Sequence, residues 1–461
     1  MKTSFAPDRL ADPAIAEAEQ ILRRCVHCGF CTATCPTFLE LGDERDSPRG
    51  RIYMMKGMLE RDEPATADVV RHIDRCLGCF ACMTTCPSGV DYMHLSDMAR
   101  ARVAETYTRP LPERLLRGLL ARLLPYPGRF RAALIGGRIA KRLGLDRWLG
   151  GLRPELKAMM ALMPDEVPAP AATDRPQLWP AEGTRRGRVA LLAGCAQQVL
   201  APGINAATIR VLTRHGFDVV VAREAGCCGA LVQHMGLMEQ ARDQARRNVA
   251  AWAALADQPG GLDAIVVTTS GCGTPIKDYG HLLAGDAYYA DRARLVAGLA
   301  RDVTEVLAGL DLTPVRSLPA GLPVAYHAAC SLQHGQKIRD LPKEVLKRLG
   351  VTPLEPAEPH ICCGSAGTYN MLQPELAGRL GGPQGTEPAP HRGGGGGGGQ
   401  SGLPDPDRRA YARSPLHSYR RTGRLADWRA GARGAGRGGR RGGVSVVRRR
   451  CRRCRAWSCH R

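Results

Sequence analysis

Residues 25–36 read CVHCGFCTATCP, and residues 76–87 read CLGCFACMTTCP. Each stretch is a CxxCxxC triplet, followed after three more residues by a fourth cysteine that directly precedes a proline. This spacing is typical of chains that hold two 4Fe–4S clusters, where the fourth cysteine of each run serves the other cluster. We therefore expect one cluster at Cys25, Cys28, Cys31 and Cys86, and a second at Cys76, Cys79, Cys82 and Cys35.

Closely spaced cysteines can also bind zinc, but zinc sites usually use two CxxC pairs. Two complete four-cysteine runs favour iron–sulfur clusters. The chain has 18 cysteines in 461 residues. In a secreted protein they would indicate disulfides, whereas CxxC spacings in a cytosolic protein indicate metal.

Residues 1–20 contain no apolar signal region, and no run of 18 apolar residues occurs. We expect a cytoplasmic protein that can lie on the inner face of the membrane through a partner.

The formal net charge of +21 is concentrated at one end of the chain. Residues 381–461 hold 19 arginines, no lysine and 4 acidic residues, whereas the other 380 residues hold 46 basic and 40 acidic side chains. The body of the chain therefore gives no reason to expect nucleic acid as a partner.

The rest of the chain divides by composition into further segments. The apolar spacing of residues 15–25, 50–62 and 69–76 predicts helices around the two cysteine runs. Residues 109–130 are amphipathic and basic, which favours a packed helix with a solvated basic face over a membrane-surface helix. Residues 164–183 are rich in proline and alanine and predict an extended linker. The expected segments are a helical two-cluster domain (1–105), a helical connector and linker (106–185), two cysteine-rich modules (186–310 and 320–380) and an Arg/Gly-rich tail (381–461).

The two cysteine-rich modules are an internal repeat. In each, a cysteine is followed by 31 residues and then by Cys-Cys-Gly: Cys195 before Cys227 and Cys228, and Cys330 before Cys362 and Cys363. Apolar runs at 188–195, 218–222 and 264–272 alternate with helical segments, which predicts a small parallel α/β sheet. We call residues 186–310 the first Cys-Cys-Gly module and residues 320–380 the second.

The module cysteines are candidates for a further redox or metal site. Loops at the carboxyl ends of parallel strands converge on one crevice, so thiols there can bind another iron–sulfur centre, a thiol substrate or zinc, or be inert. Adjacent cysteines do not readily bridge each other. The histidines nearby, which are more often structural than functional, can hydrogen-bond a sulfur. The thiols are Cys195, Cys227, Cys228 and Cys272 in the first module and Cys330, Cys362 and Cys363 in the second; the histidines are His234, His327 and His334.

No nucleotide-binding fingerprint is apparent, so we expect the chain to conduct electrons and not to oxidise the organic substrate itself. Between the two cysteine runs, the charges of residues 43–56 either tune a cluster potential, dock a partner, or belong to a solvated turn. The fold expected is an α-helical ferredoxin-like N-terminal domain followed by two α/β Cys-Cys-Gly modules.

Two ferredoxin-type runs followed by two Cys-Cys-Gly modules resemble a family of electron-transfer subunits. It includes the iron–sulfur subunits of glycolate oxidase and of anaerobic glycerol-3-phosphate dehydrogenase, and heterodisulfide reductase subunits. The finer strings resemble the first of these from about residue 15 to about residue 380. They are CVHCGFCTATCPTF, GDERDSPRGRIYMMK, TRPLPER, NAATIRVL, EAGCCGALVQH, SGCGTPIKDYG and HICCGSAGTYN.

The resemblance implies a complex with flavin-containing glycolate oxidase subunits. Glycolate would be oxidised to glyoxylate in a partner, and electrons would pass through two 4Fe–4S clusters toward a quinone or other acceptor. The alternatives are the same carrier role for glycerol 3-phosphate or lactate, and a thiol–disulfide enzyme like heterodisulfide reductase. Some relatives carry a further iron–sulfur centre in these modules and end the motif in CxxC. Here Gly273, Thr274 and Pro275 follow Cys272, so the last cysteine is missing.

The resemblance stops near Leu380, and we interpret residues 381–461 as the product of a frameshift. Read one base over, permitted codons for residues 403–408, LPDPDR, can spell Cys-Leu-Thr-Gln-Ile-Ala. The resemblance implies a Cys-x-Thr-Gln segment at about this distance in the second module. The alternative is a disordered Arg/Gly tail that binds RNA or an acidic membrane. A chain that truly ends this way would leave the second module with an incomplete sheet and a smaller core.

Overall fold

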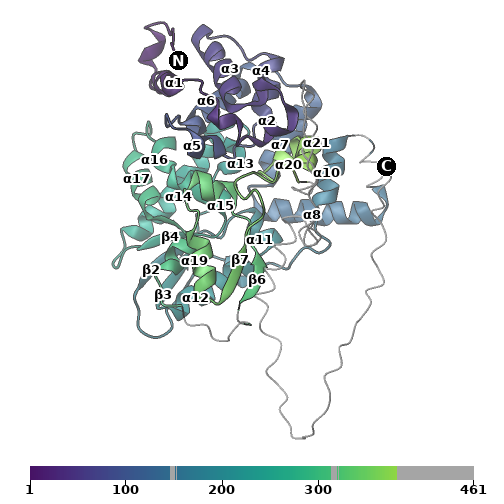
Figure 1. The fold of residues 1–461 in the computed structure, drawn as a ribbon. Helices are drawn as coiled ribbons and strands as arrows, with labels where there is room; N and C mark the ends of the chain where they lie inside the picture. Colours follow the sequence, from purple (N-terminus) through teal and green to yellow (C-terminus); the bar gives the residue numbers. More distant parts are fainter. Residues whose placement is uncertain (146–150, 152, 313–318, 320, 382–461) are drawn as a thin grey trace, which may run out of the picture. The chain divides into compact units, whose positions relative to one another are not determined.

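The computed structural model describes residues 1–145, 151, 153–312, 319 and 321–381 (Figure 1). The interpretation of residues 381–461 as a frameshift product therefore concerns residues that lie, apart from Gly381, outside the described part. Within the described ranges, no helix has both the length and the apolar character needed to span a bilayer.

The N-terminal region is helical, as the apolar spacing predicted. Short polar side chains begin its helices: the Asp12 carboxylate accepts from the amide of Ala14, and the Ser47 hydroxyl accepts from the amide of Gly50. Leu22 and Leu95 are fully buried in the core that these helices share. The helices are α1 (Pro13–Arg24), α2 (Pro36–Leu41), α3 (Pro48–Arg61), α4 (Ala67–Asp74), α5 (Ala81–Thr85) and α6 (Tyr92–Thr106).

The connector differs from its prediction in two ways. The amphipathic segment forms two helices, α7 (Leu111–Leu123) and α8 (Pro127–Arg142), because proline fits the first turn of a helix but not its interior. A further helix of the described part, α10 (Pro154–Leu162), lies C-terminal to them. The predicted linker contains a short strand, β1 (Gln177–Trp179), which pairs antiparallel with a strand of the first module. Its Leu-Trp pair has the side chains that a sheet edge favours, and the surrounding prolines masked this signal.

The first module is a five-stranded sheet with the order β1-β3-β2-β4-β5. Apart from β1 all its pairs are parallel, as predicted. Successive side chains of a strand point to opposite faces of the sheet, so the sheet has a hydrophobic core on each face. Val189 and Leu191 lie in one core, and Ala190 and Leu192 lie in the other. The strands are β2 (Gly187–Leu191), β3 (Phe217–Val221), β4 (Ala264–Val267) and β5 (Ala300–Asp302); the helices are α11 (Ala196–Leu200), α12 (Gly203–Arg214), α13 (Ala230–Gln233), α14 (Met238–Ala256), α15 (Ser270–Lys277), α16 (Tyr279–Leu282), α17 (Ala290–Leu299) and α18 (Val303–Ala308).

The described part of the second module contains two parallel strands. Residues of β6 (Leu322–Ala325) alternate between half-buried and exposed, whereas every residue of β4 in the first module is buried. The strand and helix order up to β7 repeats that of the first module. The elements are β6, β7 (Val351–Leu354), α19 (Leu341–Arg348), α20 (Tyr369–Leu372) and α21 (Pro374–Gly381).

The two modules contact each other beside their cysteine loops. The hydroxyls of Ser270 and Ser331 are 2.8 Å apart, and Thr274 Oγ1 donates to the carbonyl of Ser331 at 3.0 Å. Glycine is required at this contact, because a Cβ at Gly335 would lie 2.6 Å from Thr274 Oγ1. The start of α15, which carries Cys272, is thereby held against the short π-helix (Ser331–Gly335) that follows Cys330.

Candidate functional site

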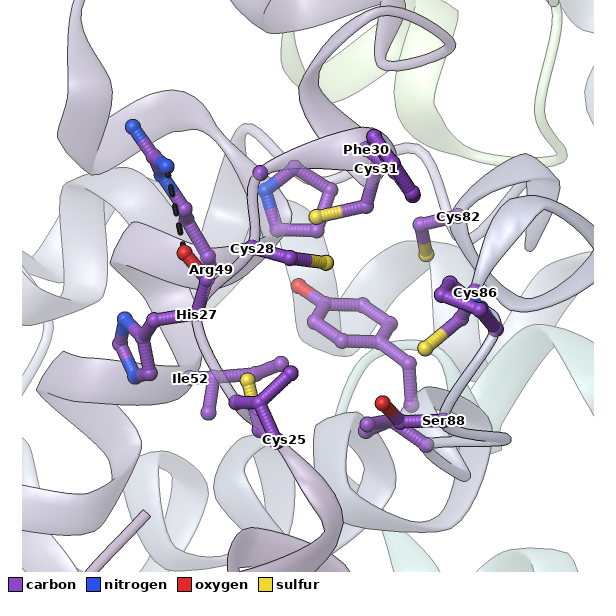
Figure 2. Close-up of a pocket in the computed structure, with 16 residues that line it drawn as sticks. Cys25, His27, Cys28, Phe30, Cys31, Arg49, Ile52, Cys82, Cys86 and Ser88 are labelled. Carbon is purple, nitrogen blue, oxygen red and sulfur yellow. Dashed lines mark hydrogen bonds between the residues drawn. The ribbon is translucent and has the colours of Figure 1, made fainter.

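Four of the predicted ligands line one cavity of the helical region. Cys25 follows α1, Cys28 and Cys31 lie in the next loop, and Cys86 follows α5. Figure 2 shows their sulfur atoms around a common space, with that of Cys82 near Cys86. The loop turns through Gly29, whose φ of +87° is a conformation that side chains rarely adopt. A Cβ there would also lie 2.5 Å from a guanidinium nitrogen of Arg49.

The other four cysteines line a second cavity. Cys76 and Cys79 lie in the loop after α4, Cys82 lies in α5, and Cys35 reaches the same cavity from the first run. Cys82 and Tyr92 line both cavities, so the two cavities share a wall. A cluster in each would therefore lie close to its neighbour, as electron transfer between them needs.

The donor set suits a cationic metal centre. Burial raises the pKa of the Cys25 thiol, raises that of Cys31 to about 11, and raises those of Cys79 and Cys82 well above the usual value. Neighbouring thiolates add to each of these shifts by repulsion. A bound metal ion reverses this balance, because its charge stabilises the thiolates that coordinate it. The residues present thus fit iron–sulfur clusters.

A buried charge network supports the second cavity. Arg51 and Asp46, 1% and 0% exposed, pair at 3.2 Å between Nη2 and Oδ1. Nη1 of Arg51 lies 3.9 Å from the sulfur of Cys35, and the same guanidinium donates to the carbonyl of His72 at 2.7 Å. Burial opposes ionisation of Cys76, but the charges of Arg51 and Arg100 outweigh it and lower the pKa of that thiol. The sequence indicated charges between the two runs but did not show that two of them are buried beside a predicted ligand.

The first module brings its four cysteines together. Cys195 follows β2, Cys227 and Cys228 follow β3, and Cys272 lies in the helix after β4, so all are at the carboxyl ends of parallel strands. The Cys195 thiol is hydrogen-bonded to Cys227, and the Cys228 thiol to Cys227 and Cys272. Tyr279 supports this group by donating to the carbonyl of Cys228 at 2.8 Å.

The second module brings together three cysteines. The Cys362 thiol is hydrogen-bonded to both Cys330 and Cys363. Cys79, from the second cavity, packs into the same apolar cluster as Cys330 and Cys362. The Tyr369 hydroxyl donates to the carbonyl of Arg75 at 3.0 Å and so ties this module to the loop that carries Cys76.

The three histidines near the modules contact groups other than the sulfurs. His234 Nδ1 lies 3.5 Å from Nη1 of Arg100, and burial with that positive charge lowers its pKa to about 3. His334 pairs with the hydroxyl of Thr84 at 2.8 Å and with the carbonyl of His360 at 3.1 Å. His327 hydrogen-bonds the backbone of Ile361. These contacts are with nitrogen and oxygen atoms, and two of the histidines tie the helical region to the modules.

Comparison with known proteins places these sites in a family. The model of the 4Fe–4S dicluster domain matches residues 21–90, and that of the cysteine-rich domain matches residues 189–277 and 324–382. The chain is 44% identical over 382 residues to the glycolate oxidase iron–sulfur subunit of Escherichia coli (strain K12), which covers 82% of this chain and 88% of that protein.

Other relatives share less. The probable glycolate oxidase iron–sulfur subunit of Bacillus subtilis (strain 168) is 35% identical over 373 residues, which is 78% of this chain and 82% of that protein. A fumarate reductase (CoM/CoB) subunit of Methanothermobacter marburgensis is 29% identical over 196 residues, which is 42% of this chain and 36% of that protein. The chain is an iron–sulfur protein of the electron-transfer type, and it belongs to the family of glycolate oxidase iron–sulfur subunits.

Proposed function

We propose that this chain carries electrons from a flavin-containing subunit, where glycolate is oxidised to glyoxylate, toward a quinone-type acceptor. The observation that carries the proposal is the pair of thiol-lined cavities that share a wall at Cys82. Glycolate is the proposed substrate because the relatives that the chain matches over most of its length are named glycolate oxidase iron–sulfur subunits. The 4Fe–4S clusters would supply one-electron chemistry, and the chain would hold them close together.

The crossed ligand sets are part of this proposal. Cys86 shares the first cavity with the thiols of the first run, and Cys35 shares the second cavity with those of the second run. Each run thus supplies three ligands to one cavity and one ligand to the other. The proposed sets are Cys25, Cys28, Cys31 and Cys86, and Cys76, Cys79, Cys82 and Cys35.

We propose that the module cysteines form a further redox or metal site. The second module packs against Cys79, so a redox centre there would be next in line after the second cavity. The thiol–disulfide alternative is less favoured, because hydrogen bonding and burial raise the pKa of Cys195 and Cys228, and the reactive form of cysteine is the thiolate. Turnover of a disulfide by the isolated chain would support that alternative.

Glycolate should reduce the clusters of the assembled complex. The chain is co-expressed with its genomic neighbours and purified without oxygen, and EPR spectra are recorded after addition of glycolate, lactate or glycerol 3-phosphate. We expect reduced-cluster signals with glycolate and not with the other two. Signals that appear with dithionite but not with glycolate would retain the carrier role and assign it to another donor.

We also propose that α7 and α8 hold the complex on the anionic inner surface of the membrane. Leu111, Leu115 and Leu119 recur every four residues on α7 and are 56%, 64% and 47% exposed, so the predicted packing of this helix holds only in part. Ile135 and Ile139 of α8 are exposed as well. Between positions 109 and 142 the chain has nine basic residues and one acidic residue. Arg109 and Arg117 pair with Asp74 and Glu113, and the remaining basic side chains complement anionic lipid.

Leu111, Leu115 and Leu119 form an exposed ridge on α7. Charged substitutions on this ridge should release the complex from lipid. Burying a leucine contributes about 1.5–3 kcal/mol, so Leu115→Asp with Leu119→Asp should lower vesicle binding by about tenfold or more. Binding is measured by co-sedimentation with phosphatidylglycerol vesicles. Leu295→Asp, at a leucine that is 46% exposed on α17, is the matched control and should bind as wild type does. Unchanged binding of the ridge variant, or its loss of the partner subunits, would contradict this placement.

A further inference from the structure

Three helices that are distant in the sequence converge on a group of metal-ligating side chains away from the cysteines. Glu17 lies on α1, His94 on α6 and His281 on α16. One ligand atom from each lies within 4.8 Å of the other two. Oε1 of Glu17 is 2.8 Å from Nε2 of His281 and 3.8 Å from Nδ1 of His94.

These separations are suited to a small divalent cation. Two nitrogen or oxygen ligands at about 2.1 Å from a tetrahedral zinc ion lie roughly 3.4 Å apart, and the observed separations lie on either side of that value. The rings of His94 and His281 are stacked, with centroids 3.5 Å apart and planes 14° apart. Both imidazoles therefore present their edges to the same carboxylate, and a modest side-chain adjustment would place all three around one ion.

The surroundings add a second carboxylate behind the histidine ligand. Asp278 accepts at 3.1 Å from Nε2 of His94, the nitrogen that faces away from Glu17. A carboxylate behind a ligating histidine is the arrangement that fixes ring orientation and raises ligand basicity in metal sites. Asp91 lies 2.8 Å from Nδ1 of the same ring and adds negative charge.

Three carboxylates surround the two imidazoles, those of Glu17, Asp91 and Asp278. Carboxylate oxygens and imidazole nitrogens are both ligands that zinc accepts. Ions can reach the group through a cavity of about 820 Å³ that Glu17, His94 and His281 all line.

We propose that Glu17, His94 and His281 bind a zinc-like divalent cation, with Asp278 orienting His94. Glu17 and His94 belong to the helical region that contains the two thiol-lined cavities, and His281 belongs to the first Cys-Cys-Gly module. The cation therefore cross-links these two parts of the chain and fixes how their redox sites are placed. The proposal is independent of the electron donor.

Zinc bound to the cluster-loaded protein should depend on these side chains. The anaerobically reconstituted protein is incubated with zinc chloride and desalted, and its zinc and iron are measured by mass spectrometry. The variants are Glu17→Gln and His281→Gln, each at a partly exposed side chain. The control is His215→Gln, on a histidine that bonds the carbonyl of Val211 at the end of α12.

We expect each site variant to bind about one zinc ion fewer than wild type, with unchanged iron, while the control binds as wild type does. X-ray absorption at the zinc edge should show nitrogen and oxygen ligands in the fraction that the variants lose. Equal zinc in wild type and both site variants, whether none or bound only through sulfur, would overturn the proposal. A lost fraction with sulfur ligands would do the same.

Discussion

Replacing Cys86 by alanine should remove the same iron–sulfur EPR signal as replacing Cys28, although the two cysteines belong to different runs. Both line the first cavity, so either change leaves that cluster with three thiolates (Figure 2). Each variant should lose about four iron atoms, the content of one cubane, and its glycolate-driven reduction of the acceptor should fall to background. Iron content, EPR spectra and turnover of the purified complex measure these effects.

The fourth cysteine of the first run tests the crossed ligand sets from the other side. Cys35→Ala should remove the signal that Cys79→Ala removes and leave the other in place. Cys330→Ala is the matched control, because that thiol lines neither cavity, and it should retain both signals. If Cys86→Ala instead removed the same signal as Cys79→Ala, each run would hold its own cluster and the crossed assignment would be wrong.

The sequence predicted the helical, then α/β, fold because local signals encode it. The apolar runs at β2, β3 and β4 are long enough to mark buried strands, and their alternation with helices permits little except a parallel sheet. The strand β1 was missed because three residues among prolines carry almost no periodicity. Its place is set by the free edge of β3, which is a tertiary feature.

The cysteine patterns indicated which thiols to examine, but the charges around them are a property of packing. Nothing in residues 43–56 distinguishes Arg51, which is buried, from Arg45, half exposed in its ion pair with Asp43. The Glu17 and His281 contact joins positions 264 residues apart and has no local signal. The frameshift interpretation stays a prediction, and sequencing the 3′ end of the gene together with the intact mass of the native protein would decide it.

Removing the charge of Arg51 should lower the midpoint potential of the cluster in the second cavity. A reduced cluster carries one more negative charge, and the guanidinium, 3.9 Å from the sulfur of Cys35, stabilises that charge where water does not screen it. Arg51→Met should therefore make this cluster harder to reduce, with a smaller change at the first cluster. Arg51→Lys, which keeps the charge, should shift the potential less. EPR-monitored redox titration of the anaerobic complex measures both potentials.

Asp46→Asn separates this electrostatic effect from simple damage to the fold. Breaking a buried ion pair costs about 3–5 kcal/mol of stability, so both Asp46→Asn and Arg51→Met should lower the free energy of unfolding. Their potentials should move in opposite directions, because Asp46→Asn removes a negative charge from the same buried network and favours the reduced cluster. A purely structural role for the pair predicts shifts of the same sign in both variants, or none. Opposite signs with similar losses of stability would show that the network sets the potential of the cluster that it contacts.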